Sequence, residues 1–177
     1  MKVYYMNGAG NDFMVIDGRG VRVDYAQWAK QLCALRGADG FMAVDSSDTA
    51  DFRLHFYNSD GSRGEMCGNG ARCICRYGLE NGLAGRVQRV ETTAGLVTGW
   101  QVDRQRYRVR LNDPCNIRLH DRMEVEGTIY DCAYLELGDP GIPHAVVPIR
   151  GLQDYDTQTL RRLGRRLRYD PAFPKGA

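Results

Sequence analysis

Short apolar runs bounded by glycine, asparagine and aspartate turns set the strongest limit on how this chain can fold. Such runs, when they are rich in β-branched and aromatic side chains, are typical of β-strands. The clearest is residues 52–57, in which apolar and polar side chains alternate. We expect strands over residues 2–6, 14–17, 41–44, 52–57, 87–92, 96–102, 107–111, 128–137 and around 145–147.

Two other segments have the apolar spacing of a helix with one buried face. The first covers residues 25–35, and the second covers about residues 71–80, where Asn81-Gly82 supplies a stop signal. A third segment, the arginine-rich residues 161–168, is expected to form a helix with a solvated basic face.

We place a domain boundary at Asn112-Asp113-Pro114 and expect a first domain over residues 1–112. Residues 113–177 are too few to form a second domain like the first, and the final residues 169–177 suggest an extended loop. We therefore expect residues 113–177 to be the incomplete start of a second half.

Composition excludes several classes of protein. Hydrophobic residues make up 43% of the chain and charged residues 26%, which is ordinary for a globular protein. A formal net charge of +2 does not indicate a nucleic-acid partner. No stretch approaches the roughly 18 apolar residues that span a bilayer, and no apolar leader follows Met1-Lys2. We expect a cytoplasmic protein with reduced thiols and no membrane partner.

The spacing of the cysteines does not indicate a metal site. Cys73 and Cys75 would point about 200° apart on a helix, so they cannot hold one zinc ion together with Cys67. We expect Cys73 and Cys75 to pack in or beside the core. Buried, inert thiols are also expected at Cys33, Cys115 and Cys132.

Two glycine-rich segments suggest phosphate binding at first sight, but neither fits. A dinucleotide site needs Gly-x-Gly-x-x-Gly at the start of a helix. The segment at residues 8–13 ends in Phe13 and leads into a strand, and the segment at residues 68–73 ends in Cys73. Nucleotide binding is therefore a weak interpretation, and no bound cofactor is expected.

Cys67 stands immediately before the glycine-rich start of the second helix. Unpaired backbone N–H groups and the helix dipole at such a position favour the thiolate form of a cysteine. Gly68 and Gly70 would let a ligand carboxylate approach the same N–H groups, and Asn69 adds an amide. Position alone is equally compatible with a chance cysteine at a helix start.

The segment Glu-Met-Cys-Gly-Asn-Gly-Ala-Arg-Cys at residues 65–73 resembles the first active-site signature of the diaminopimelate epimerase family. Other blocks of the chain are similar to further family segments in the same order, so the resemblance covers essentially the whole chain. These blocks are residues 7–13, 36–40, 56–62, 141–144 and 173–177.

The resemblance implies an α/β (α+β) fold of two similar halves, each a curved, mostly antiparallel sheet wrapped around a central helix. It implies interconversion of LL- and meso-diaminopimelate by two opposed thiols without pyridoxal phosphate, in lysine and cell-wall precursor biosynthesis. Cys67 would be one acid/base thiol, and Asn11, Asn58, Gly68 and Asn69 would contact the amino-acid substrate. The family also allows for a homodimer.

Two departures from the family pattern affect this prediction. The second catalytic cysteine belongs to a C-terminal half, and no other cysteine here lies in a Cys-Gly-Thr context. We therefore expect a fragment that does not perform two-thiol epimerisation alone. Ile142 stands where family members often place asparagine, beside an insertion-like loop at residues 139–141.

These departures leave three alternatives open. The substrate could be another amino acid, such as histidine; the chain could bind an amino acid without catalysis; or Cys67 could serve thiol redox chemistry. His144 is expected near the active site without a proton-transfer role, and His55 is expected to be structural.

Overall fold

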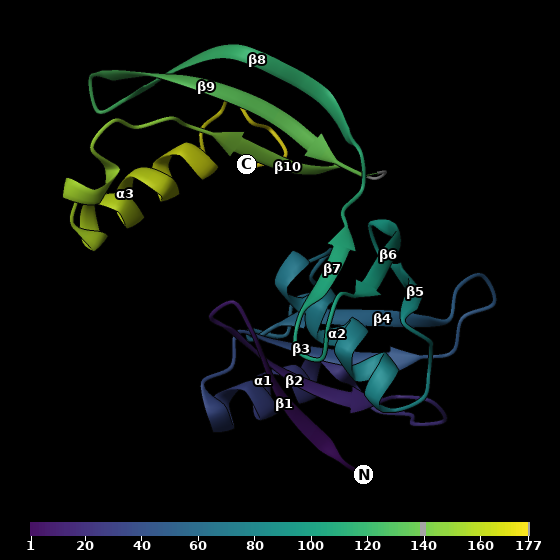
Figure 1. The fold of residues 1–177 in the computed structure, drawn as a ribbon. Coiled ribbons are helices and arrows are strands. Elements are labelled where there is room, and N and C mark those ends of the chain that lie inside the picture. Colours follow the sequence, from purple (N-terminus) through teal and green to yellow (C-terminus); the bar gives the residue numbers. More distant parts are fainter. Residues whose placement is uncertain (139–140, 177) are drawn as a thin grey trace. The chain divides into compact units, whose positions relative to one another are not determined.

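The computed structural model describes residues 1–138 and 141–176 (Figure 1). It divides into two compact units, Met1–Asn112 and Asp113–Ala177, and each is described by itself. The expected loop residues Asp139 and Pro140, and the terminal residue Ala177, lie outside the described residues.

The first unit contains a seven-stranded sheet and two helices. The strands pair in chain order, and only the β2–β3 and β4–β5 pairs are parallel. Parallel neighbours need a crossover connection, and the two helices lie within these two connections. The elements are β1 (Val3–Gly8), β2 (Asn11–Asp17), α1 (Tyr25–Arg36), β3 (Gly40–Asp45), β4 (Phe52–Asn58), α2 (Gly68–Glu80), β5 (Val87–Thr92), β6 (Gly95–Gln101) and β7 (Tyr107–Arg110).

The sheet curves around α2 (Figure 1). This helix contacts β1 and β2 near one edge of the sheet and β6 and β7 at the other edge. A flat sheet of this width could not touch one helix with both of its edges. The expected curved, mostly antiparallel sheet around a central helix is therefore confirmed for the first unit.

The inner strand β3 is buried on both faces because a helix covers each side of the sheet there. Met42 and Val44 belong to the core cluster that includes the buried face of α2. Phe41 and Ala43, which point the other way along the strand, pack in the cluster that includes α1 residues. The continuous apolar run of this strand thus reflects its position between two helices.

Strands β1 and β2 extend further into their connecting turn than expected. Strand pairing continues to Gly8 and Asn11, and only Ala9 and Gly10 form the turn, with φ angles of 52° and 93°. Two consecutive positive φ angles are typical of a two-residue hairpin turn that matches strand twist. The expected strands over residues 2–6 and 14–17 were therefore too short at this end, because such a turn needs only two residues.

The second unit is a three-stranded antiparallel sheet with one α-helix among its described residues. The strand order is β10-β9-β8. The elements are β8 (Pro114–Val125), β9 (Thr128–Leu137), β10 (Ile142–Val146), a short 3-10 turn η1 (Leu152–Asp154) and α3 (Thr157–Arg168).

A strand at β8 was not expected from the sequence. Residues 114–120 are all exposed, so they lack the buried alternation by which a strand is usually detected. Pairing with β9, interrupted by register shifts, holds this segment in the sheet.

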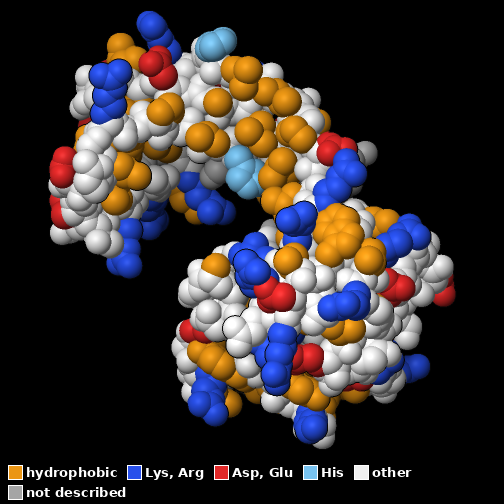
Figure 2. All heavy atoms as spheres, viewed as in Figure 1, with side chains coloured by type: hydrophobic (Ala, Val, Ile, Leu, Met, Phe, Trp, Pro, Cys, Tyr) orange, Lys and Arg blue, Asp and Glu red, His pale blue; other side chains and the backbone are white. Residues whose placement is uncertain are grey.

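Helix α3 has the expected basic, solvated face. Leu163 and Leu167 are buried against the sheet, whereas the arginines of the helix are exposed. Elsewhere on this unit, hydrophobic side chains gather over strands β8–β10 (Figure 2). The exposed apolar residues there include Ile117, Leu119, Ile129 and Val146.

The segment after α3 is anchored to the sheet of the second unit. Phe173 is buried and stacks on Tyr134, with ring centroids 5.2 Å apart. Lys175 Nζ lies 2.9 Å from Glu136 Oε2. This ion pair lowers the pKa of Glu136, and a hydrogen bond from Tyr134 lowers it further. The expected loop is therefore irregular in backbone but fixed by side chains.

All six cysteines are free thiols. Cys33, Cys73, Cys75 and Cys132 are buried as expected, but Cys115 is exposed, so that expectation was wrong. Cys115 lies at the exposed start of β8, where it donates to the Gly138 carbonyl at 3.4 Å.

The structure gives no metal centre among its described residues, since no three His, Cys, Asp or Glu side chains are placed to share an ion. No helix in this part of the chain has the length and apolar character to cross a membrane.

His55 is structural, as expected, and gives the first unit a pH-dependent stability. Its ring is largely buried beside Tyr25, with centroids 5.6 Å apart, and lies 3.6 Å from Asp45. Burial lowers the pKa of His55 below its ordinary 6.5, although Asp45 acts in the opposite direction.

We expect the unfolding free energy to fall as the pH drops below about 6.5, until the lowered pKa of His55 is passed. In this window the unfolded chain binds a proton that the folded chain does not. Urea unfolding across pH 5–8 measures the effect, and His55→Gln should flatten this part of the profile. Equal slopes in both proteins would contradict the prediction.

Candidate active site

Cys67 occupies the N-cap position of α2, immediately before the first residue of the helix. Its backbone is extended, with φ −124° and ψ 117°, and its carbonyl accepts the Ala71 N–H at 2.8 Å. Its side chain makes no capping hydrogen bond and is partly exposed. The thiol therefore stands at a helix end whose first N–H groups have no acceptor within the helix.

Helix α2 begins at Gly68, three residues before the expected start near Ala71. The predicted start rested on the apolar spacing of the helix, which begins at Ala71. The earlier start is explained by packing: Gly70 is buried, and a Cβ there would lie 3.3 Å from Met42 Sδ and 3.6 Å from the Phe13 ring. The absence of a side chain at Gly70 thus lets the first turn of the helix lie close to the core.

Two of the predicted substrate-binding residues are in direct contact. Asn69 Nδ2, in the first turn of α2, donates to Asn11 Oδ1, at the start of β2, at 2.6 Å. Gly8 makes this approach possible, since a Cβ there would lie 2.8 Å from both Asn69 O and Cys73 Sγ. Contact between the β1–β2 hairpin and the start of α2 therefore depends on the absence of a side chain at position 8.

A carboxylate and a guanidinium extend this amide pair at its two ends. Asn11 Nδ2 donates to Asp39 Oδ2 at 3.2 Å, and Arg72 donates to Asn69 Oδ1. Neither Asp39 nor Arg72 was predicted as a site residue. Both lie within the family-like blocks, but only the fold shows that they meet the two asparagines.

Asn58 lies at the same end of the sheet but in a separate turn. It is paired with Gly40 across β3 and β4, and the adjacent Ser59 N–H donates to Asp39 O at 3.1 Å. Its own side-chain amide donates to Ser62 Oγ at 2.9 Å. The structure therefore brings Asn58 near the Asp39 segment without joining its side chain to the Asn11–Asn69 pair.

The other thiols of α2 are unsuited to proton transfer at neutral pH. Burial raises the pKa of Cys73 to about 11 and that of Cys75 to about 12. Both remain protonated thiols within the core. Cys67, partly exposed just before the helix, is the most exposed of these three thiols.

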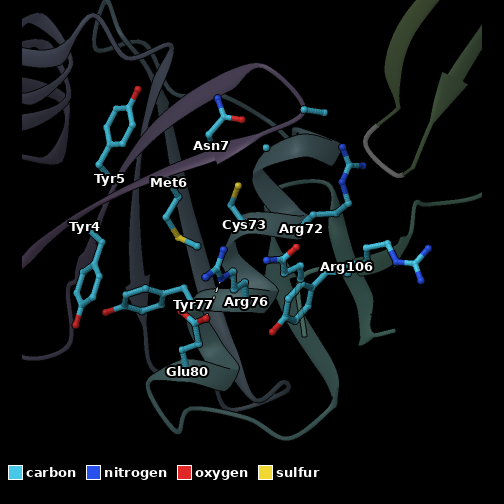
Figure 3. Close-up of a pocket in the computed structure, with 14 residues that line it drawn as sticks. Tyr4, Tyr5, Met6, Asn7, Arg72, Cys73, Arg76, Tyr77, Glu80 and Arg106 are labelled. Atoms are coloured by element: carbon cyan, nitrogen blue, oxygen red, sulfur yellow. Dashed lines mark hydrogen bonds and ion pairs between the residues drawn. The ribbon is translucent and has the colours of Figure 1, made fainter. Parts of the chain in front are cut away.

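A cavity of about 600 Å³ lies between β1 and α2 (Figure 3). Arg72 and Cys73 line it from the helix, and Met6 and Asn7 line it from the strand. Cys67 is not among its described lining residues. Arg72 thus borders this cavity while it also holds the Asn69 amide.

His144 lies in the second unit, where its ring is exposed and Nδ1 donates to Ile142 O at 2.9 Å. Ile142 itself begins β10 and pairs with Leu137. The ring is not packed in a core, and the expected place of His144 near the active site stays a prediction.

Taken together, the first unit places an accessible thiol, a helix N-terminus and an amide pair within one short stretch of α2 and its neighbour β2. Helix N-terminal N–H groups and amide N–H groups bind carboxylates. A thiol beside such a carboxylate site can take or give a proton. This arrangement suits a small ligand that carries a carboxylate.

Comparison with known sequences gives consistent matches along the chain. The family model described as "Diaminopimelate epimerase" matches residues 3–114. The diaminopimelate epimerase of Aquifex aeolicus is 33% identical over 192 residues, which cover 99% of this chain and 66% of the relative. The enzymes of Desulfitobacterium hafniense and Archaeoglobus fulgidus are 34% and 35% identical, with 68% and 65% of their lengths covered. The chain spans about two thirds of the length of these relatives.

Comparison with solved structures supports the fold. A protein described as a probable proline racemase from Agrobacterium radiobacter K84 matches 96% of this chain and 61% of its own, with a TM-score of 0.65 and 15% identity. A hydroxyproline epimerase from Agrobacterium vitis matches 92% of this chain and 56% of its own, with a TM-score of 0.61 and 20% identity. At such low identities these likenesses concern the fold alone.

Proposed function

This chain belongs to the diaminopimelate epimerase family, and we propose on that basis that it supplies one half of the site of a cofactor-independent amino-acid epimerase. One observation carries the proposal: Cys67 is at the N-terminus of α2, beside the hydrogen-bonded amides of Asn69 and Asn11. In the whole protein the reaction is the interconversion of LL- and meso-diaminopimelate, in lysine and cell-wall precursor biosynthesis.

In this proposal the Cys67 thiolate takes the α-proton of the bound amino acid and becomes a thiol. The electron pair of the broken C–H bond moves into the substrate carboxylate. N–H groups at the start of α2, at Gly68 and Asn69, stabilise this developing charge more strongly than the charge of the ground state. Asn11 and Asn58 complete the binding site.

The return of the proton determines the stereochemical result. If Cys67 returns it, the α-carbon exchanges its proton and keeps its configuration. Inversion requires a second acid on the opposite face of the α-carbon. Cys67 is the acid/base thiol of this chain. We therefore propose that the 177 residues alone exchange the α-proton and retain the configuration of the α-carbon. The whole protein inverts that configuration.

We further propose that residues 1–112 are the first half of the family fold and residues 113–177 the start of the second half. The division of the chain into compact units after Asn112 supports this proposal. So does the exposed apolar surface over β8–β10, which a complete second half would cover.

The test is alkylation of the native chain by iodoacetamide at pH 8, followed by mass spectrometry of each cysteine peptide. Cys67 and the exposed Cys115 should react, whereas Cys73 and Cys75 should not, because their raised pKa values keep them protonated. LL-diaminopimelate at ten times its dissociation constant should slow alkylation of Cys67 about tenfold. Cys115 is the internal control and should react at an unchanged rate.

Other ligands in the same assay separate the alternatives. Stronger protection by L-histidine than by diaminopimelate would assign the site to another amino acid, in keeping with Ile142 in place of the common asparagine. Protection of Cys67 by neither amino acid, in a chain that remains folded, would contradict the proposed function and favour thiol redox chemistry.

A further inference from the structure

The Asp39 carboxylate is held in a fixed place at the end of the sheet. The Asp39 N–H donates to Asp12 O at 2.9 Å, and its carbonyl accepts the Ser59 N–H at 3.1 Å. The Asp39 backbone is therefore hydrogen-bonded to Asp12 in β2 on one side and to Ser59, which follows β4, on the other. These bonds fix the backbone of Asp39, and the Asp12 N–H that donates to Oδ2 holds its side chain.

One oxygen of this carboxylate accepts two hydrogen bonds. Asp39 Oδ2 lies 2.9 Å from the Asp12 backbone N and 3.2 Å from Asn11 Nδ2. An ionised carboxylate can only accept hydrogen bonds. The nitrogen of the Asn11 amide must therefore face Asp39, and its oxygen must face Asn69.

Arg72, which lies at the other end of this series of hydrogen bonds, requires the same orientation of the amides. A guanidinium can only donate, so the Asn69 oxygen must face Arg72 and its nitrogen must face Asn11. Asp39 and Arg72 together allow one orientation of both amides. Each amide nitrogen carries a second N–H that this hydrogen-bond chain does not use.

We infer that Asp39 is a positioning residue of the ligand site: it holds the Asn11 amide, and through it the Asn69 amide, so that their second N–H groups face a ligand carboxylate. This inference rests on the proposed function for its ligand. Asp39 itself does not touch the ligand. Asp39 orients the Asn69 amide only through Asn11. Asn69 lies beside Cys67, in the first turn of α2.

The test uses two readouts on the 177-residue chain. The first is the pair of side-chain amide proton signals of Asn11 and Asn69 in NMR spectra without ligand. The second is the affinity for LL-diaminopimelate by titration. Asp39→Ala should shift and broaden the amide signals of both asparagines, and should weaken binding about tenfold, as expected for loss of a hydrogen bond to a charged group.

Two further variants separate positioning from a general structural effect. Asp39→Asn keeps an acceptor oxygen and should restore the amide signals and the affinity toward those of the unaltered chain. In an Asn11→Ala background, Asp39→Ala should cause no further change at Asn69, because the link between them is already missing. If Asp39→Ala does not fold, Asp39→Ser takes its place in the test. Serine is polar but too short to reach Asn11, so we expect the same results from it.

Three results would overturn the inference. The first is unchanged Asn11 and Asn69 amide signals in Asp39→Ala, and the second is an equal loss in Asp39→Asn. The third is a full effect of Asp39→Ala on Asn69 in the Asn11→Ala background. If the unaltered chain does not bind LL-diaminopimelate, the proposed function fails, and the amide signals of the ligand-free chain still decide the role of Asp39.

Discussion

Replacement of Cys67 by serine is expected to lower the rate of α-proton exchange of diaminopimelate about a thousandfold. A serine hydroxyl stays protonated at neutral pH, so it cannot take the α-proton as a thiolate does. The fold should be retained, because serine is a favoured residue at the position before a helix. Deuterium uptake from deuterated water, followed by mass spectrometry of the amino acid, measures the rate.

Cys115→Ser is the matched control for this variant. Cys115 is exposed and lies in the second unit, so its replacement should leave the exchange rate unchanged. Exchange by Cys67→Ser at a rate close to that of the unaltered chain would show that another group transfers the proton.

The second large effect concerns the helix that carries Cys67. Ile74 lies on α2 with no exposed surface and belongs to the core cluster of the first unit. Ile74→Ala should lower the unfolding free energy by about 2–5 kcal/mol, since it removes buried methyl groups and leaves a cavity. Urea unfolding followed by tryptophan fluorescence reports on this unit, because Trp28 and Trp100 both lie within it.

Leu35→Ala is the control for the stability measurement. Leu35 is also an aliphatic residue of a helix in the first unit, but it is 76% exposed. Its replacement should change the unfolding free energy by no more than about 0.5 kcal/mol. Losses of similar size in the two variants would contradict the enclosure of α2 by the curved sheet.

Much of the first unit follows from its hydrophobic pattern. The alternation in residues 52–57 predicts β4, and the apolar spacing in residues 25–35 predicts α1, which spans Tyr25–Arg36. These segments are predictable because one face of each is more deeply buried than the other. Strand β8 escaped prediction because its first half is exposed on both faces and therefore lacks an apolar alternation, although it pairs with β9.

The candidate site was predictable only in part. The family-like block at residues 65–73 identified Cys67, and the structure places it at the start of α2. The apolar spacing placed that start too late, because the glycines before Ala71 have no side chain that could contribute to it. The hydrogen bond between Asp39 and Asn11 joins residues 28 positions apart, and no local pattern encodes such a contact.

Deuterium incorporation into LL- and meso-diaminopimelate by the unaltered 177-residue chain tests the central claim most directly. A single thiolate approaches the α-carbon from one face. We therefore expect deuterium to enter only α-carbons of one configuration, with that configuration retained. A folded chain that binds diaminopimelate but leaves both isomers unlabelled would contradict a role for Cys67 in proton transfer.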